Sequence, residues 1–327
     1  MRPVVAGQVT IGIPSRNRRD LLMRTVHSLL EQTYPYVQVI VSDDASEDGT
    51  AEALATITDP RLVYFRQPEL TGVVRNQNAV LQAAEGEFFI LSSDDDILAP
   101  DALRQLVDPF LHGACGKPGC EFGLSWCPCD IIDVANRRMY TTDAGPLCES
   151  SVDFMYNLYM GARGPRCSAV MMRTQSAWEA GGFDEDRVGA LCDTTNWGGA
   201  ALKHRWVACI PSPLAKYTVH AASYTSHSKC ADWQRWGKAM IQGHVSQLRA
   251  QGDEVGARKL ARAESTLQVN LTADVLLRSR LSSGWYKQVI AEVWRSRKIL
   301  LTRTTFKRIL RDGWKMLRYS RPSARAN

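Results

Sequence analysis

The chain has 327 residues, 45% of them hydrophobic and 23% charged, which are the proportions of a globular protein and exclude an intrinsically disordered one. Its net charge of +6 is unevenly distributed, because residues 226–327 hold 21 Lys and Arg against 7 Asp and Glu, whereas residues 1–225 are net acidic. This asymmetry predicts two regions with different partners, a domain at 1–225 and a basic helical region at 226–327, and no apolar run is long enough to predict a membrane-spanning helix.

The first hundred residues alternate short β-branched apolar runs with stretches of helical periodicity. The helical stretches place apolar residues three and four apart, and Asp20 is expected to cap the first of them. Buried strands are predicted at 9–13, 37–41, 62–65 and 88–91. Strands that alternate with helices indicate an α/β fold with a mostly parallel central sheet and helices on both faces.

The pattern loosens over residues 113–164 and then becomes regular again. A helix is expected near 195–203, and beyond Asp232 helix breakers are few, so the pattern predicts a C-terminal α-helical extension. Further strands are expected at 122–127, 169–172 and 206–210.

Three adjacent carboxylates, Asp94, Asp95 and Asp96, directly follow the fourth expected strand. Neighbouring carboxylates repel one another, so this arrangement favours a site where a cation offsets their charge. Mn²⁺ and Mg²⁺ prefer oxygen ligands and take part of their coordination shell from substrate phosphates and water. The alternative is a solvated acidic turn ahead of the helix that begins near Pro100.

Polar residues also follow the first two expected strands, at 14–17 and 43–46. Because ligands bind beyond the carboxyl ends of strands in such sheets, these two strand ends predict a cleft for a base and a ribose. Each segment read alone could be an ordinary turn. Arg75, at the start of the third expected helix, could pair with phosphate or base oxygens, or it could be an exposed helix arginine.

The nine cysteines are too sparse for a disulfide scaffold in a chain of this length. Their number is odd and we recognise no secretory signal, so we expect reduced thiols in a cytosolic protein. Four of them, Cys115, Cys120, Cys127 and Cys129, have a spacing that matches none of the usual zinc sites, and free thiols are favoured over a structural zinc.

Five motifs follow one another along the chain. They are Ile13-Pro14-Ser15-Arg16-Asn17, the run from Asp43 to Thr50, Gly72-Val73-Val74-Arg75-Asn76, the run from Leu91 to Asp101, and Ala180-Gly181-Gly182-Phe183-Asp184-Glu185. Taken in this order, they resemble glycosyltransferase family 2, the inverting enzymes with the GT-A fold, a Rossmann-like fold, and the resemblance covers about the first two-thirds of the chain. It implies an enzyme that moves a sugar from a UDP- or dTDP-sugar to an acceptor hydroxyl, with polysaccharide or glycolipid assembly as the expected setting.

The resemblance implies roles for individual residues on the donor side. Asp44 would bond the uracil or thymine ring, Arg75 would approach the base or ribose, and Asp94 would lie at the ribose. The metal would be held by Asp95 or the neighbouring Asp96, with His220 as a further metal or diphosphate contact or, alternatively, a structural histidine. This chain has Ser93 where many family members carry an aspartate. The residues expected along the nucleoside are Pro14, Arg16 and Asn17.

The resemblance also implies a catalytic base, an aspartate that follows the Gly-Gly-Phe-Asp-Glu turn. Asp193 stands at that place, preceded by Cys192 where family members often carry a first carboxylate. Asp193 would take the proton of the acceptor hydroxyl, or it could be the N-cap of a helix, and the two roles are compatible. Asp184 and Glu185 are rivals that we interpret as turn residues.

The basic C-terminal region interleaves Arg and Lys with large apolar side chains, and several of these fit one face of a helix. Such a helix could lie on an anionic membrane surface, bind nucleic acid, form a homodimer, or pack on the catalytic domain. We therefore expect a cytoplasmic enzyme, free or at the inner face of the membrane. The alternatives are a glycosyltransferase that modifies nucleic acid and a non-catalytic nucleotide-sugar-binding protein. The residues of the helical face are Phe306, Ile309, Leu310, Trp314 and Leu317.

Overall fold

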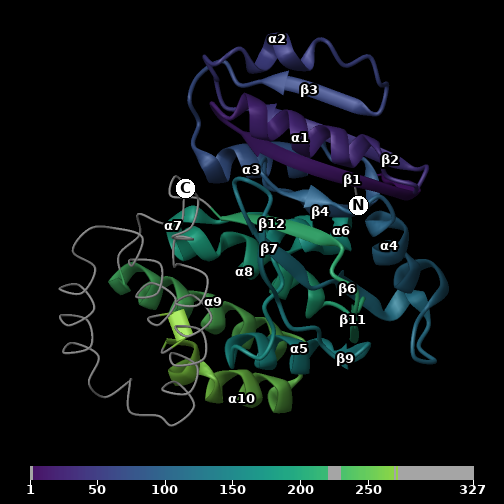
Figure 1. The fold of residues 1–327 in the computed structure, drawn as a ribbon. Coiled ribbons are helices and arrows are strands. Elements are labelled where there is room, and N and C mark those ends of the chain that lie inside the picture. Colours follow the sequence, from purple (N-terminus) through teal and green to yellow (C-terminus); the bar gives the residue numbers. More distant parts are fainter. Residues whose placement is uncertain (1–2, 220–229, 269, 272–327) are drawn as a thin grey trace, which may run out of the picture.

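The computed structural model describes residues 3–219, 230–268 and 270–271, and it confirms the predicted α/β fold (Figure 1). An eight-stranded sheet with strand order β3-β2-β1-β4-β10-β6-β11-β9 lies between layers of helices. The strands are β1 (Val5–Ser15), β2 (Val37–Asp43), β3 (Leu62–Arg66), β4 (Gly86–Leu91), β6 (Phe122–Trp126), β9 (Cys148–Ser150), β10 (Val170–Arg173) and β11 (Trp206–Cys209).

The central sheet is mostly parallel, as predicted. Strand β1 runs parallel to β2 and β4, and β2 runs parallel to β3. Strand β10 is antiparallel to both β4 and β6, and β9 is antiparallel to β11, which itself runs parallel to β6. The carboxyl ends of β1, β2 and β4 therefore meet at one edge, where ligands bind in sheets of this kind.

A second, four-stranded sheet with order β5-β12-β7-β8 escaped the sequence prediction. Within the segment 113–164 the predicted strand at 122–127 is confirmed as β6, but β7, β8, β9 and helix α5 were not predicted, and neither were β5 and β12. These strands are too short for a periodicity to mark them, and β12 pairs with segments far away in the chain, whereas β7 and β8 pair with each other as neighbours. The strands of this sheet are β5 (Ile97–Leu98), β7 (Cys129–Asp133), β8 (Arg138–Thr141) and β12 (Ala215–Val219).

Two hydrophobic cores flank the large sheet, because successive side chains of a strand point to opposite faces. Val9, Ile11 and Ile13 of β1 enter one core, with helices α1, α2 and α4 and the second sheet. Phe89 and Leu91 of β4 enter the other core, with helices α3, α5, α6 and α8 to α10. The helices are α1 (Arg19–Leu30), α2 (Thr50–Leu54), α3 (Val73–Ala83), α4 (Ala102–His112), α5 (Ser151–Tyr159), α6 (Thr174–Glu179), α7 (Glu185–Val188), α8 (Cys192–Ala201), α9 (Cys230–Ala250) and α10 (Glu254–Arg262).

The start of α1 differs from the prediction that Asp20 caps it. Arg18 occupies the N-cap position without a side-chain capping bond, and Asp20 lies in the first turn. An acidic side chain there still interacts favourably with the helix dipole. The apolar residues Leu22, Val26 and Leu29 are fully buried, as their helical spacing predicts.

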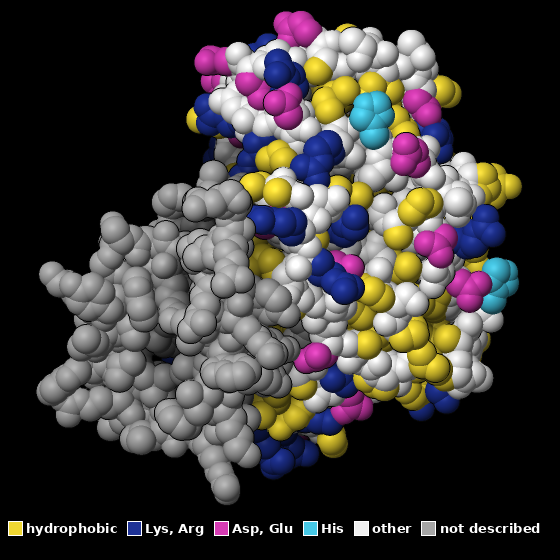
Figure 2. Space-filling model, viewed as in Figure 1, with side chains coloured by type: hydrophobic (Ala, Val, Ile, Leu, Met, Phe, Trp, Pro, Cys, Tyr) yellow, Lys and Arg dark blue, Asp and Glu magenta, His cyan; other side chains and the backbone are white. Residues whose placement is uncertain are grey.

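Helices α9 and α10 pack into the same core as α8, and Figure 1 shows α9 alongside α8. Met240, Ile241 and Leu260 are buried there. The amphipathic face expected at 306–317 lies outside the described residues. Among the residues that the structure describes, no helix combines the length and apolarity that crossing a membrane requires. On the face shown in Figure 2, basic, acidic and apolar side chains are interspersed.

His244 of α9 ties that helix to α8 and α5. Its Nε2 lies 2.9 Å from the carbonyl oxygen of Thr195 in α8, and its Nδ1 is hydrogen-bonded to the hydroxyl of Tyr159 in α5. Because a carbonyl only accepts, Nε2 carries the proton and Nδ1 accepts from Tyr159 in the neutral ring. Burial lowers the pKa of His244 to about 4.

The free energy of unfolding is expected to fall between pH 7 and pH 5 by about 2 kcal/mol through His244 alone. The unfolded chain takes up this proton near pH 6.5 and the folded chain near pH 4, so the unfolded state binds more protons in that window. Urea unfolding at both pH values, followed by tryptophan fluorescence, measures the change. His244→Gln should show a pH dependence smaller by that amount, and an unchanged dependence would contradict the assignment.

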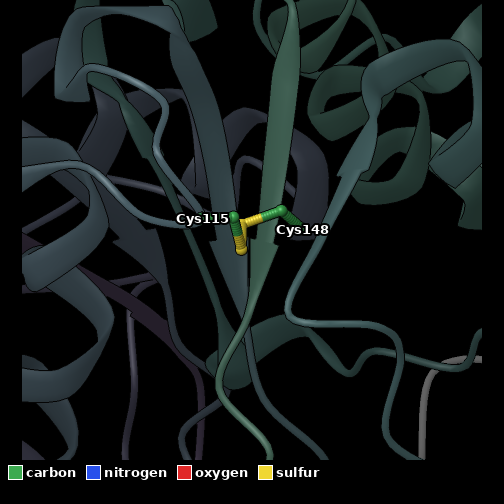
Figure 3. The surroundings of a disulfide bond; sticks show 2 residues. All are labelled: Cys115 and Cys148. Atoms are coloured by element: carbon green, nitrogen blue, oxygen red, sulfur yellow. A yellow bond between two sulfur atoms is a disulfide. The ribbon is translucent and has the colours of Figure 1, made fainter.

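The structure corrects the expectation that all the cysteines are free thiols, because Cys115 and Cys148 form a disulfide (Figure 3). The short loop that carries Cys115 follows α4 and folds back on itself through a bridge between Ala114 and Lys117. Cys148 begins the edge strand β9, which pairs with β11. The two residues are 33 positions apart in the chain, so their spacing alone could not reveal the pairing.

Reduction of this disulfide is expected to lower the free energy of unfolding by about 2–4 kcal/mol, since it opens a covalent loop of that length in the unfolded chain. Thermal melts with and without dithiothreitol measure the effect. The double variant Cys115→Ser with Cys148→Ser is the control, and its melting temperature should not respond to the reductant. An equal melting temperature of the wild-type protein in both conditions would argue against the bond.

Candidate active site

The acidic cluster, defined as Asp94, Asp95 and Asp96, lies just beyond the carboxyl end of β4 and is at most 8% exposed. The alternative of a solvated acidic turn is therefore wrong. Asp94 accepts a hydrogen bond from the Ser15 hydroxyl, 2.8 Å from its Oδ2, and from Nη1 of Arg18, 2.9 Å from its Oδ1. The same Nη1 lies 3.3 Å from Oδ2 of Asp95. One guanidinium thus faces two buried carboxylates.

Asp96 is held by residues far away in the chain. The Ser168 hydroxyl donates to its Oδ2 at 2.6 Å, and the Thr218 amide donates to its Oδ1 at 3.0 Å. Burial, followed by repulsion from Asp95, raises the pKa of Asp96 to about 8. Both oxygens of Asp96 have protein donors, so this side chain holds the segment after β4 to Ser168 and to Thr218 of β12, while Arg18 contacts both Asp94 and Asp95.

The acidic cluster offers oxygen ligands for an additional cation. Burial raises the pKa of Asp94, and repulsion from Asp95 adds to this effect although Arg18 opposes it. Asp94 and Asp95 place several carboxylate oxygens beside the Arg18 guanidinium, and these are the ligands through which a divalent ion would bind. Within the described residues, no three His, Cys, Asp or Glu side chains form a metal-binding group. His220 lies outside the described residues.

The ends of β1 and β2 are joined into one corner. The Asp44 amide donates to the Ser15 carbonyl at 2.9 Å, and the Glu47 amide donates to Oδ1 of Asn17 at 2.8 Å. Asn17 adopts φ 51°, a left-handed conformation that asparagine tolerates better than most residues. The predicted residues Pro14, Asn17 and Asp44 thus lie on connected segments, and Arg16 is exposed beside them.

Asp44 anchors the loop ahead of α3. Its Oδ1 accepts from the amide and the hydroxyl of Thr71, at 2.7 and 2.8 Å, and its Oδ2 accepts from the Gly72 amide at 3.0 Å. A carboxylate oxygen has two lone pairs, so Oδ2 keeps capacity for one more donor, such as a ring N–H. Asn76 holds the first turn of α3 to the Ser42 carbonyl at 2.9 Å, and Arg75 is exposed on that turn.

Asp193 lies in the first turn of α8, and Leu191 is the N-cap residue, so the expectation that Asp193 caps this helix is wrong. Its Oδ1 accepts from the amide and the hydroxyl of Thr194, at 2.5 and 3.1 Å. The Cys167 thiol shows which groups surround this carboxylate. Burial raises the pKa of Cys167, and the negative charges of Asp193, Asp96 and Asp95 raise it further. The fold thus brings Asp193 within electrostatic reach of a side chain that also lies close to the acidic cluster.

The turn from Gly181 to Asp184 is fixed on α3. Asn78 of α3 donates to the Phe183 carbonyl at 2.8 Å and accepts from the Phe183 amide at 2.9 Å. Asp184 accepts from the Arg187 amide and forms an ion pair with the Arg187 guanidinium at 3.2 Å, as suits a turn residue. The start of α8 is held to α3 as well, because the Cys192 thiol donates to Gln77 at 3.2 Å.

Comparison with known proteins agrees with this arrangement. The family model Glycosyl transferase family 2 matches residues 10–118, which include the β1 and β2 corner, Arg75 and the acidic cluster. Residues 10–118, a third of the chain, are thus similar to glycosyltransferase family 2. The match ends before Asp193, so the family model itself does not cover the expected base.

Three similar proteins illustrate the relationship. The chain is 31% identical over 109 residues, 33% of its length, to TuaG of Bacillus subtilis, a glycosyltransferase assigned to teichuronic acid biosynthesis, and it covers 43% of that protein. The structure of S. aureus TarS 1-349 in complex with UDP-GlcNAc superposes with a TM-score of 0.62 at 16% identity, covering 84% of this chain and 82% of that TarS 1-349 chain. The mannosyltransferase PcManGT of Pyrobaculum calidifontis, in complex with GDP-Man and Mn²⁺, gives a TM-score of 0.53 at 18% identity, with coverage of 94% and 85%.

These comparisons show the fold of the chain, but they do not show its activity. The two solved structures confirm the GT-A fold, which is all that identities below 20% can carry. The chain spans less than half the length of the first curated relatives that it matches. Its activity, donor and acceptor are therefore proposals.

The structure adds four residues to the site for which the sequence had predicted no role. Ser15 and Arg18 contact Asp94, while Ser168 and Thr218 contact Asp96. Ser15 and Arg18 lie in or beside the first motif, which could have signalled them, whereas Ser168 and Thr218 carry no local signal. Trp197, which follows Asp193 closely in the chain, is a buried core residue and is not exposed for an acceptor sugar to stack on.

Proposed function

We propose that this protein is a metal-dependent, inverting glycosyltransferase that moves a sugar from a UDP- or dTDP-sugar to an acceptor hydroxyl. The observation that carries the proposal is the buried acidic cluster at the carboxyl end of β4, where Arg18 contacts both Asp94 and Asp95. Asp193, about a hundred residues further along the chain, supplies another carboxylate at the start of α8. Cys167, whose thiol donates to the Leu91 carbonyl at the end of β4 at 3.1 Å, feels the charge of both. A transferase of this kind needs both elements close together, a cation site for the leaving diphosphate and a base for the attacking hydroxyl.

The donor would lie across the carboxyl ends of β1, β2 and β4. Asp44 has one acceptor position left for the N–H of a uracil or thymine ring, and Pro14, Arg16 and Asn17 line the adjoining corner. Arg75 is exposed on the first turn of α3 and is available to the ribose or the base. TarS, which has the same fold, was solved in complex with UDP-GlcNAc, and this supports a uridine nucleotide sugar as the donor.

The residues present fit a divalent cation. Asp95, with Asp94 beside it, provides buried carboxylate oxygens next to Arg18, and Mg²⁺ or Mn²⁺ completes its coordination with phosphate oxygens and water. When bound, the ion would stabilise the negative charge that develops on the leaving diphosphate. His220 remains a proposed additional ligand, and the resemblance to the family motif places Asp95 at the metal.

Asp193 would act as the general base. The acceptor hydroxyl oxygen forms a bond to the anomeric carbon while the bond from that carbon to the diphosphate oxygen breaks, and the hydroxyl proton moves to the Asp193 carboxylate. Attack from the face opposite the leaving group inverts the configuration at that carbon. The Thr194 amide and hydroxyl, which both donate to Oδ1, would hold the carboxylate in a fixed orientation.

We propose polysaccharide or glycolipid assembly as the setting, because TuaG is assigned to the biosynthesis of a surface polysaccharide. The test of the proposed function is a thermal-shift screen of UDP-, dTDP- and GDP-sugars, each with and without Mn²⁺. A stabilising shift with a uridine or thymidine donor that depends on the metal, followed by slow hydrolysis of that donor, is the expected result. No shift with any nucleotide sugar in the presence of Mn²⁺ or Mg²⁺ would overturn the proposal.

A further inference from the structure

Arg18 occupies the position between Asp94 and Asp95 that a bound cation would need. A single nitrogen, Nη1, lies 2.9 Å from Oδ1 of Asp94 and 3.3 Å from Oδ2 of Asp95. Both carboxylate side chains are less than 10% exposed, whereas the arginine side chain is 27% exposed. The Arg18 guanidinium therefore approaches the buried carboxylates from the solvent side.

The backbone on either side of Arg18 is held by hydrogen bonds. Replacement of the guanidinium by a metal ion would therefore require only the Arg18 side chain to move. Before it, the Asn17 amide donates to the Ser46 hydroxyl at 2.9 Å. After it, the Arg19 amide donates to Asp48 at 2.9 Å. The guanidinium sits at the end of a long stem with several rotatable bonds, so it can leave the carboxylates without moving either anchored neighbour.

The charges at the site determine when a metal ion can replace the Arg18 guanidinium. Removing Arg18 from the site without a replacement would take its positive charge away from two buried carboxylates, which is costly. A divalent ion can replace it only by displacing a positive charge that is already hydrogen-bonded to both carboxylates. A nucleoside diphosphate changes the balance, because its phosphate oxygens supply further ligands to the ion and a new partner for the displaced guanidinium.

We propose that Arg18 is a positioning residue that acts as an internal counter-cation of the acidic site, competes with the divalent metal, and so makes tight metal binding depend on the donor diphosphate. This inference rests on the proposed function and adds an order to it, in which the metal binds tightly only together with the nucleotide. By linkage, the nucleotide and the metal each raise the affinity of the protein for the other.

The test is a titration of the full chain with Mn²⁺ in the absence of nucleotide, in which the signal of free Mn²⁺ is followed by electron paramagnetic resonance. Arg18→Gln is expected to bind Mn²⁺ about tenfold or more tightly than the wild-type protein, because the competing charge is gone. Arg18→Lys keeps the charge and should bind as weakly as the wild type. A merely structural role of Arg18 predicts the opposite sign, since a damaged site binds metal less well.

Two controls locate the effect. Arg19→Gln removes a neighbouring arginine that pairs with exposed Asp20, and its Mn²⁺ affinity should match that of the wild type. Adding Asp95→Asn to Arg18→Gln should abolish the gained affinity. Arg18→Met serves as a second charge-removing variant if the glutamine variant does not fold, as judged by circular dichroism.

The outcomes separate this inference from the function on which it rests. If UDP with Mn²⁺ binds to the wild type but removal of the Arg18 charge leaves the Mn²⁺ affinity unchanged or lower, only the competition is overturned. If neither the wild type nor any variant binds Mn²⁺, with or without UDP, the proposed metal site fails and the competition fails with it.

Discussion

Asp193→Asn is expected to lower kcat for sugar transfer by about a hundredfold to ten-thousandfold. The amide keeps the shape of the side chain and can still accept the hydrogen bonds that the Thr194 amide and hydroxyl donate to Oδ1. It cannot take up the proton of the acceptor hydroxyl, so the loss should fall on the chemical step. Initial rates of transfer, measured beside the dissociation constant of the donor, separate the two effects, and the affinity for the donor should change little.

Asp184→Asn is the matched control. Asp184 belongs to the turn that ends the last family motif, and it accepts from Arg187 at the start of α7. The fold thus already explains Asp184 as a turn residue, so its variant should keep kcat within a few-fold of the wild type. If Asp184→Asn lost activity to the degree expected of Asp193→Asn while the latter stayed active, the base would be misassigned.

Asp95→Asn and Asp96→Asn are expected to have very different effects on Mn²⁺-dependent donor binding, although the residues are neighbours and both are buried. Asp95→Asn should weaken Mn²⁺-dependent donor binding by about a hundredfold or more, since even residues that only support a metal ligand contribute ten- to a hundredfold in affinity. Isothermal titration with UDP, in the presence of Mn²⁺ and in its absence, measures this effect.

Asp96→Asn should keep the metal-dependent binding of UDP within a few-fold. The amide oxygen can accept from the Thr218 N–H, and the amide nitrogen can donate to the Ser168 hydroxyl oxygen, so the brace between β4 and β12 survives. If Asp96→Asn lost metal-dependent binding while Asp95→Asn kept it, the two neighbours would exchange the roles assigned here.

The sequence predicted the parts of the fold that depend on local patterns. The first four strands of the large sheet, and the helices between them, follow from runs and periodicities within a few residues of one another. The second sheet was missed because its strands have only two to five residues, and because β12 joins distant segments, pairing with β5 across more than a hundred positions. The disulfide between Cys115 and Cys148 was missed for the same reason, since it joins a loop to an edge strand.

In the candidate site, too, local motifs mark some residues, whereas contacts between distant segments could not be predicted. The positions of Asp44, Asp94 and Asp193 could be named in advance, because a short motif or the residues beside it mark each of them. The contacts that hold Asp96 could not be predicted, because they depend on Thr218, which is 122 residues away from Asp96 in the chain. The competition by Arg18 depends on side-chain geometry that no spacing encodes.

The most direct test of the account is a crystal structure of the full chain soaked with UDP and Mn²⁺. We expect the ion about 2.1 Å from a carboxylate oxygen of Asp95 and from a phosphate oxygen, with the base beside Asp44 and the Arg18 side chain withdrawn from the two aspartates. A nucleotide bound away from the ends of β1, β2 and β4, or an acidic cluster that still holds Arg18 and no ion while UDP occupies the protein, would contradict it.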